Sequence, residues 1–219
     1  MDHIAAVIFD LDGVIVSTDE FHYLAWKELA DAEGIPFGRA DNERLRGVSR
    51  IESLDILLEK ATKPYSDPAK LDMAERKNSI YRALLERLSP ADLLPGVSAV
   101  LEGLRARGVK IAIGSSSKNA GSILQAIGLA DAFDAVADGT HITKSKPDPE
   151  VFTLAAQRVG VAAGHCLVVE DAHAGVEAGL AAGMRVLAVG SAADHPSATL
   201  RAKDLSVISI EEMLFTTPV

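Results

Sequence analysis

The chain has 219 residues, 48% of them hydrophobic, and its 31 acidic and 22 basic side chains give a formal net charge of −9. This balance argues against nucleic acid or an anionic membrane as a partner, because phosphate backbones are bound by clustered lysine and arginine. No stretch approaches the ~20 apolar residues of a membrane span, and nothing at the N-terminus resembles a secretory signal. The single cysteine, Cys166, excludes an internal disulfide. We therefore expect a cytoplasmic globular protein.

The first predicted element is a buried strand that ends in two carboxylates. An uninterrupted apolar run over residues 4–9 precedes Asp10-Leu11-Asp12-Gly13. Apolar residues without alternation are typical of a strand buried on both faces of a parallel sheet. Open α/β folds bind ligands at the carboxyl ends of such strands, so Asp10 and Asp12 are candidate functional residues. A helix-capping Asp followed by a surface Asp would give the same pattern.

Residues 15–90 are predicted to be helical, with no convincing strand among them. Ser17-Thr18-Asp19-Glu20 indicates a helix start, with a hydroxyl cap and acids in the first turn, and Gly34 ends that helix. Ser49-Arg50-Ile51-Glu52 fits a capping box at the start of a second helix. A third amphipathic helix is predicted over residues 72–88, after a turn bracketed by two prolines.

Strands return beyond residue 95 and alternate with helices. Helices are predicted over residues 97–107, 119–127, 174–182 and 193–203 and after the Asp148-Pro149 start, and strands over 109–113, 133–137, 166–169, 185–189 and 205–208. This alternation indicates a doubly wound, mostly parallel α/β sheet of the Rossmann-like class. The helical segment interrupts that core after its first strand. We predict a core domain of residues 1–15 and 92–219 and an inserted helical cap domain of residues 16–91.

Polar side chains follow three of the predicted strands. They are Asp10 and Asp12, then Ser115, then Glu170 and Asp171, with Lys146 before an intervening helix. The carboxyl ends of parallel strands share one edge of the sheet, so these groups are expected to converge. Four carboxylates need a cation to stay ionised together, and oxygen ligands without His or Cys favour Mg²⁺. Taken singly, each group also has an ordinary explanation, such as a helix cap at Asp171 or a solvated Lys146.

In this order, these residues resemble the four motifs of the haloacid dehalogenase (HAD) superfamily, most of whose members are Mg²⁺-dependent phosphotransferases. The resemblance implies that Asp10 attacks phosphorus to form an aspartyl phosphate, and that Asp12 serves as general acid and base. It also implies that Ser115 and Lys146 hold the transferring phosphoryl group. The implied Mg²⁺ ligands are Asp10, the backbone carbonyl of Asp12, Glu170 and Asp171.

The predicted cap contains Thr18, His22, Trp26, Arg46-Gly47-Val48-Ser49-Arg50, Ser53 and Arg76-Lys77-Asn78. With these residues it resembles the cap of the β-phosphoglucomutase family. The resemblance implies that β-D-glucose 1-phosphate and D-glucose 6-phosphate are interconverted through β-glucose 1,6-bisphosphate, which is isomerase chemistry. Arg50 would bind the phosphate that does not react. The sugar would be contacted or positioned by Thr18, His22, Trp26, Gly47, Val48, Ser53 and Lys77, with Ser116, Lys118 and Asn119 assisting from the core.

Other interpretations of these residues stay open. His22 and Trp26 would equally suit core packing, and Arg50 and Lys77 would suit solvated helix charges. The alternative function is a Mg²⁺-dependent HAD phosphatase of sugar or polyol phosphates, which would share every core residue. A phospho-accepting receiver is disfavoured, because receivers lack a large helical insert and carry the accepting Asp in mid-chain. We expect a monomer that acts on a small sugar phosphate.

Overall fold

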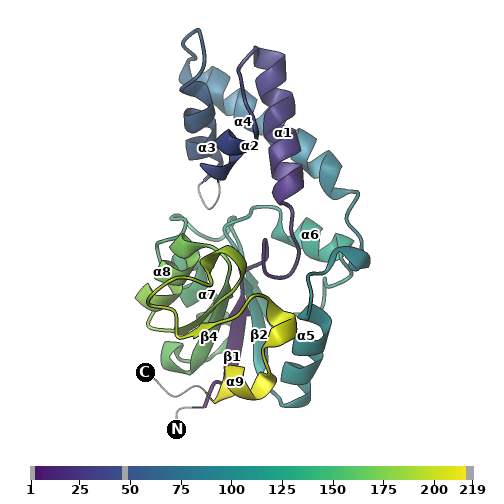
Figure 1. The fold of residues 1–219 in the computed structure, drawn as a ribbon, viewed down its shortest axis with the longest axis vertical. Helices are drawn as coiled ribbons and strands as arrows, with labels where there is room; N and C mark the ends of the chain where they lie inside the picture. The colour runs from purple at the N-terminus through teal and green to yellow at the C-terminus, as the bar shows by residue number, and fades with distance from the viewer. Residues whose placement is uncertain (1–2, 46–48, 216–219) are drawn as a thin grey trace. The chain divides into compact units, whose positions relative to one another are not determined.

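The computed structural model describes residues 3–45 and 49–215 (Figure 1). The chain divides into two compact units, one of residues 1–17 and 89–219 and one of residues 18–88. Over the described residues, no helix is both long and apolar enough to cross a membrane. The roles of the two units as core and cap stay predictions.

The larger unit is built on a parallel sheet. Over the described residues this sheet has six strands in the order β3-β2-β1-β4-β5-β6. The strands are β1 (Ala6–Phe9), β2 (Lys110–Gly114), β3 (Ala135–Ala137), β4 (Cys166–Glu170), β5 (Arg185–Ala188) and β6 (Leu200–Arg201). Every pairing is parallel, and β1 lies between β2 and β4. This arrangement confirms the predicted fold class.

Helices cover the sheet because its central strands are apolar on both faces. They are α5 (Val97–Ala106), α6 (Ala120–Ala126), α7 (Glu150–Val159), α8 (His173–Ala181) and the short α9 (Ile210–Leu214). Ile8 of β1 and Val168 of β4 are buried in one cluster with Phe152 of α7 and Val176 of α8. Side chains alternate between the two faces of a strand, so the fully buried Phe9 shows that the opposite face is covered too.

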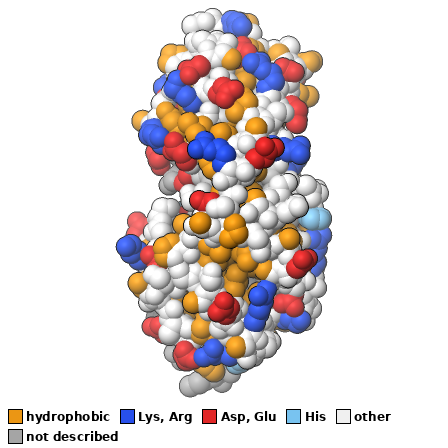
Figure 2. Space-filling model, turned by 90° about the vertical axis from the view of Figure 1, so that its right-hand side faces the viewer, with side chains coloured by type: hydrophobic (Ala, Val, Ile, Leu, Met, Phe, Trp, Pro, Cys, Tyr) orange, Lys and Arg blue, Asp and Glu red, His pale blue; other side chains and the backbone are white. Residues whose placement is uncertain are grey.

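The smaller unit is helical, as predicted. It contains α1 (Asp19–Glu33), α2 (Arg39–Glu43), α3 (Arg50–Leu58) and α4 (Asp67–Leu85). Its own core includes Trp26 and Leu29 of α1, Leu54 of α3 and Met73 of α4. The predicted capping box is confirmed, because Ser49 accepts from the Glu52 amide and the Glu52 carboxylate accepts from the Ser49 amide. On the face in Figure 2, acidic and basic side chains are interspersed over this unit.

Two predicted elements are wrong, and a third has different bounds. The helix predicted over 72–88 is confirmed as α4, but it begins earlier, at Asp67, because Pro68 stands in its first turn, where proline costs no hydrogen bond. The turn expected between Pro64 and Pro68 therefore ends before the second proline. The helix expected over residues 193–203 does not form: residues 193–199 are turns and irregular backbone, and β6 follows them, because Pro196 would interrupt such a helix. The strand expected over 205–208 is the 3-10 turn Leu205–Val207, held by the Asp204 carboxylate, which accepts from the Ser206 amide.

Candidate active site

The candidate active site lies at the carboxyl edge of the sheet, where β1 and β4 end side by side. The Asp10 backbone N–H donates to the Val169 carbonyl at 2.9 Å, and this bond keeps Asp10 beside Glu170, the last residue of β4. Both side chains are buried. Carboxylate oxygens of Asp10, Glu170 and Asp171 lie within 4.8 Å of one another. Two neighbouring strands thus bring together three of the predicted metal ligands.

Lys146 contacts two of these three carboxylates. Its ammonium Nζ lies 2.6 Å from Asp10 Oδ1 and 2.5 Å from Glu170 Oε1. Burial alone would lower the pKa of Lys146, but the charges of Asp10 and Glu170 outweigh burial and raise it. Lys146 is therefore a cation over the whole physiological range, placed where it can neutralise an incoming phosphate.

One ammonium does not balance three carboxylates. Burial raises the pKa of Glu170, and Lys146 opposes that rise while Asp10 adds to it. The negative charge that remains at Asp10, Glu170 and Asp171 suits a divalent cation, since an unbalanced buried charge is costly. The donor atoms are all carboxylate oxygens, which fits Mg²⁺.

Two glycines make room for the metal-ligand candidates. A Cβ on Gly13 would lie 2.0 Å from Asp171 Oδ2, and a Cβ on Gly175 would lie 1.9 Å from Glu170 Oε1. Gly13 also has a φ of +87°, which favours glycine over any residue with a side chain. Both positions therefore need glycine if the two carboxylates are to keep their places.

The other site residues predicted in the sheet unit are Asp12 and those of the loop after β2, residues 115–119, which we call the Ser115 loop. Asp12 is partly buried, and its side chain does not join the group of three carboxylates found among the described residues. Ser115 follows β2 and is 2% exposed, and its hydroxyl accepts from the Ser117 amide at 3.1 Å. Over the described residues, the buried Ser116 hydroxyl has no hydrogen-bond partner. Most buried polar atoms are hydrogen-bonded, so this hydroxyl is a candidate contact for a ligand. Lys118 is exposed and Asn119 precedes α6.

A second polar cluster lies within the helical unit. Lys77 of α4 is 2% exposed, and its Nζ lies 2.9 Å from His22 Nδ1. The same ammonium lies over two aromatic rings, 4.9 Å from the centre of Trp26 and 4.6 Å from that of Tyr81. Cation–π contacts of this kind allow an ammonium to be buried. Three residues predicted to contact the sugar therefore meet inside this unit.

Arg50 adds further positive charge to this cluster. Its Nη2 donates to Asn78 Oδ1 at 2.9 Å, and its Nη1 lies 3.8 Å from Glu75. Burial lowers the pKa of Arg50 without making it neutral. Burial also holds the pKa of His22 well below its usual value, and the charges of Lys77 and Arg50 lower it further. The cluster thus presents two cations and a neutral imidazole, a combination that attracts an anion.

The hydroxyl cap expected at Thr18 is wrong. Thr18 precedes α1 but its side chain does not cap that helix; its Oγ1 lies 2.8 Å from the Tyr81 hydroxyl. Tyr81 also stacks on His22, with ring centres 4.1 Å apart. Tyr81 is thus a functional candidate that was not predicted from the sequence, although its position one turn after Lys77 could have indicated it.

Ser53 is buried on α3, one turn after Arg50. Gly47 and Val48, which the sequence predicts as sugar contacts, lie outside the described residues.

Residues 4–183 match the family model of haloacid dehalogenase-like hydrolases. The chain belongs to the haloacid dehalogenase superfamily. This confirms the resemblance drawn from the strand-end residues. Within the superfamily, the chain is 43% identical over 208 residues to a β-phosphoglucomutase of Bacillus subtilis, an alignment that covers 94% of this chain and 92% of that one.

A solved structure and a phosphatase are also similar to this chain. The crystal structure of a β-phosphoglucomutase from Clostridium difficile superposes with a TM-score of 0.88 at 38% identity and covers 95% of this chain and 94% of that one. A fructose-1-phosphate phosphatase of Escherichia coli is 36% identical over 182 residues, which is 82% of this chain and 93% of that protein. Within the HAD superfamily, this chain is thus similar to both mutases and phosphatases.

In this HAD protein, the predicted site residues form two clusters. Asp10, Lys146, Glu170 and Asp171 meet at the edge of the sheet. His22, Trp26, Lys77 and Arg50 belong to the separate cluster of the helical unit. The catalytic roles of all these residues stay predictions.

Proposed function

We propose that the protein is a β-phosphoglucomutase, which interconverts β-D-glucose 1-phosphate and D-glucose 6-phosphate through β-glucose 1,6-bisphosphate. The observation that carries the proposal is the pairing of Lys77 with His22 in the helical unit, with Arg50 adding charge beside them. A phosphatase needs one phosphate site, whereas a mutase must also hold the phosphate that does not react. In the proposal, Arg50 binds this second phosphate with the charge of Lys77 nearby, and the similarity to known β-phosphoglucomutases supports the same conclusion.

In the proposed reaction, a carboxylate oxygen of Asp10 attacks phosphorus, and the bond from phosphorus to the sugar oxygen breaks. Asp12 donates a proton to the departing sugar oxygen. In the other step, the C6 hydroxyl of β-glucose 1-phosphate attacks the phosphoryl group on Asp10 while Asp12 takes its proton, which forms β-glucose 1,6-bisphosphate and frees the Asp10 carboxylate. Asp10 then attacks the C1 phosphorus of that bisphosphate, so glucose 6-phosphate leaves, the aspartyl phosphate is restored, and no phosphoryl group is passed to water.

Charge governs both steps, because a carboxylate and a phosphate repel each other. Lys146 is a cation buried against Asp10 and can neutralise the phosphoryl oxygens as they approach. Ser115, whose hydroxyl is fixed by the Ser117 amide, would donate to a phosphoryl oxygen. Mg²⁺ held by Asp10, Glu170 and Asp171 would stabilise the charge of the transferring group. Ser116, Lys118 and Asn119 would assist from the same loop.

The second candidate is a phosphatase of sugar phosphates. The similarity to a fructose-1-phosphate phosphatase favours it, because such an enzyme would use the same core residues and pass the phosphoryl group to water. The expected cytoplasmic location and monomeric state stay predictions under either function.

The test is to supply β-glucose 1-phosphate, Mg²⁺ and a trace of β-glucose 1,6-bisphosphate, and to follow products by phosphorus NMR. Glucose 6-phosphate without free phosphate would support the mutase, and steady release of inorganic phosphate would support the phosphatase. Arg50→Ala should lower mutase turnover by on the order of 100-fold, the effect of losing a charge-assisted phosphate contact. The control is Arg44→Ala, since exposed Arg44 pairs with Glu59 and is not one of the predicted phosphate ligands.

A further inference from the structure

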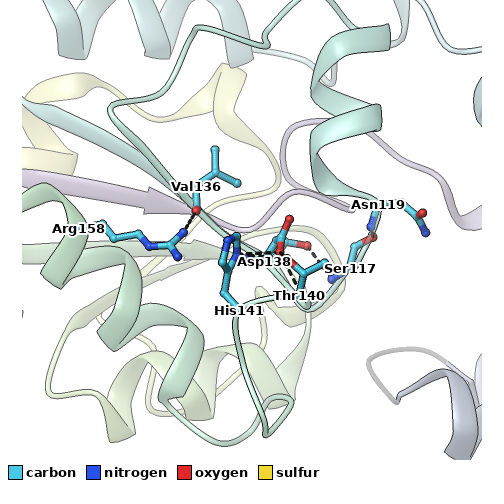
Figure 3. A network of polar contacts seen from close by, with 8 residues as sticks. Ser117, Asn119, Val136, Asp138, Thr140, His141 and Arg158 are labelled. Atoms are coloured by element: carbon cyan, nitrogen blue, oxygen red, sulfur yellow. Dashed lines mark hydrogen bonds and ion pairs between the residues drawn. The ribbon is translucent and has the colours of Figure 1, made fainter.

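The turn after β3 is fixed by one carboxylate. Asp138 Oδ1 accepts from the Thr140 backbone amide at 2.9 Å and from the Thr140 hydroxyl at 2.6 Å. The same oxygen lies 2.8 Å from His141 Nδ1, and the His141 amide donates to the Asp138 carbonyl at 2.9 Å. Figure 3 shows these side chains gathered around Asp138. Asp138 is buried, so its carboxylate depends on these partners. The geometry of residues 138–141 is therefore strongly determined.

This turn packs backbone against backbone on the Ser115 loop. The Gly139 amide donates to the Ser117 carbonyl at 3.1 Å. A Cβ on Gly139 would lie 2.3 Å from the Ser116 carbonyl oxygen and 3.0 Å from Lys118 Cγ. A side chain at position 139 would thus force the two backbones apart. Asp138 fixes the turn that contains Gly139, and the backbone of Gly139 in turn contacts that of Ser116 and Ser117.

Hydrogen bonds within the Ser115 loop connect Gly139, through Ser117, to the hydroxyl of Ser115. The Ser117 amide donates to Ser115 Oγ at 3.1 Å, and Ser117 Oγ accepts from the Asn119 amide at 3.2 Å. Ser117 is therefore held by Gly139 on one side and holds both Ser115 and the start of α6 on the other. A movement of the Asp138 turn would reach the Ser115 hydroxyl through two hydrogen bonds.

We propose that Asp138 is a positioning residue for phosphoryl transfer: its carboxylate fixes Gly139 against the Ser115 loop and so orients the Ser115 hydroxyl. This inference rests on the proposed function, which assigns Ser115 to the transferring phosphoryl group. Small displacements of such a group are costly, since a shift of about 1 Å can slow an enzyme on the order of 100-fold.

Two variants of Asp138 distinguish its role as a hydrogen-bond acceptor from the effect of its negative charge. Asp138→Ala removes the acceptor and should lower kcat by on the order of 10- to 100-fold, with a smaller change in KM. Asp138→Asn keeps a carbonyl oxygen that can accept from Thr140 and should recover most of kcat. Thr140→Val removes only the 2.6 Å hydroxyl bond and should fall between these two, which keeps the test usable if Asp138→Ala does not fold. The control is Arg158→Ala, because Arg158 donates to the Val136 carbonyl and not to the turn.

A second measurement does not depend on activity. Amide hydrogen exchange of substrate-free protein should be faster at Ser117 and Gly139 in Asp138→Ala and Thr140→Val, and unchanged there in Arg158→Ala. Unchanged exchange in all variants, or equal losses of kcat in Asp138→Ala, Asp138→Asn and Arg158→Ala, would overturn the inference. If the wild-type protein has no phosphotransferase activity, the proposed function fails, and the exchange data still decide whether Asp138 orders the loop.

Discussion

At the scale of single residues, the carboxylates of Asp171 and Glu170 fit where they are because Gly13 and Gly175 beside them have no side chain. Gly175 lies in the first turn of α8, under the carboxylate of Glu170, whose Oε2 also accepts from the Ala172 amide at 2.8 Å. Glu170 Oε2 thus accepts a backbone hydrogen bond, while Oε1 contacts Lys146 and lies where a side chain at position 175 would stand. The position of its carboxylate depends on both.

Gly175→Ala should weaken Mg²⁺ binding by about 10-fold or more, the effect usual for disturbing the surroundings of a metal ligand. The new Cβ would lie 1.9 Å from Glu170 Oε1, so the carboxylate must move. Titration calorimetry with Mg²⁺ measures the affinity. Gly121→Ala is the control, because a Cβ on this glycine of α6 would meet no described atom within 4 Å. Equal affinities in the two variants would show that Glu170 does not bind the ion.

The neutral imidazole of His22 makes the stability of the helical unit depend on pH. Burial, with Lys77 and Arg50 adding to it, lowers the folded-state pKa well below the unfolded value of about 6.5. Below pH 6.5 the unfolded chain therefore binds a proton that the folded chain excludes. The contribution of His22 to stability is fully present above about pH 6.5 and is lost as the pH falls from there toward the folded pKa.

Urea unfolding at pH 7, 6 and 5 should show this loss, with a slope of at most about 1.4 kcal/mol per pH unit below pH 6.5. His22→Asn should remove that slope, because asparagine does not titrate. The comparison is made as a difference between the two proteins, so that other titrating groups cancel. A slope that persists in the variant would assign the effect to another residue.

At the scale of elements, helix caps decide where several helices begin. Ser49 caps α3 through a reciprocal pair of bonds with Glu52, and it stands directly before Arg50. Ser66 also precedes a helix, α4, but among the described residues its side chain makes no cap hydrogen bond. The two serines are thus a matched pair for measuring what the cap contributes.

Ser49→Ala should lower the free energy of unfolding of the helical unit by about 1 kcal/mol, the usual effect of losing a side-chain cap. Ser66→Ala should change it by a few tenths of a kcal/mol at most, because no cap bond is lost. Urea unfolding followed by circular dichroism measures both. Similar losses in the two variants would show that α3 does not depend on its capping box.

At the same scale, some elements can be predicted from the sequence and others cannot. The central strands are predicted well, because β1 and β4 are continuous apolar runs that only a doubly covered sheet can bury. Asp10, Glu170 and Asp171 meet at the sheet edge as that placement predicts, since parallel strands end together. The start of α4 at Asp67 is missed, because a proline suits a first turn as well as a loop. Tyr81 is missed because its importance comes from contacts with α1, far away in the sequence.

At the scale of the whole molecule, the sheet unit contains the single thiol of the chain. Cys166 begins β4 and is fully buried, and burial raises the pKa of its thiol to about 11. The thiolate is the reactive form, so the folded protein offers almost none of it near neutral pH. Reaction of Cys166 therefore requires the sheet to open.

At pH 8, a thiol reagent such as dithionitrobenzoate should label Cys166 on the order of 10³-fold or more slower than a free thiol, in proportion to the small open fraction. Adding urea should speed labelling in parallel with the loss of sheet structure seen by circular dichroism. Labelling at the rate of free cysteine in the native protein would contradict the burial of β4.

The discontinuity of the sheet unit has a consequence for synthesis. The four residues of β1 are made first, yet their hydrogen-bonding neighbours are β2 at Lys110–Gly114 and β4 at Cys166–Glu170. The helical unit, residues 18–88, is a continuous segment and precedes both neighbours in the chain. The apolar strand before the proposed nucleophile, Asp10, thus lacks both partners until about half of the chain has emerged and lacks β4 until more than three quarters has emerged, a period in which its apolar side chains are exposed to chaperones.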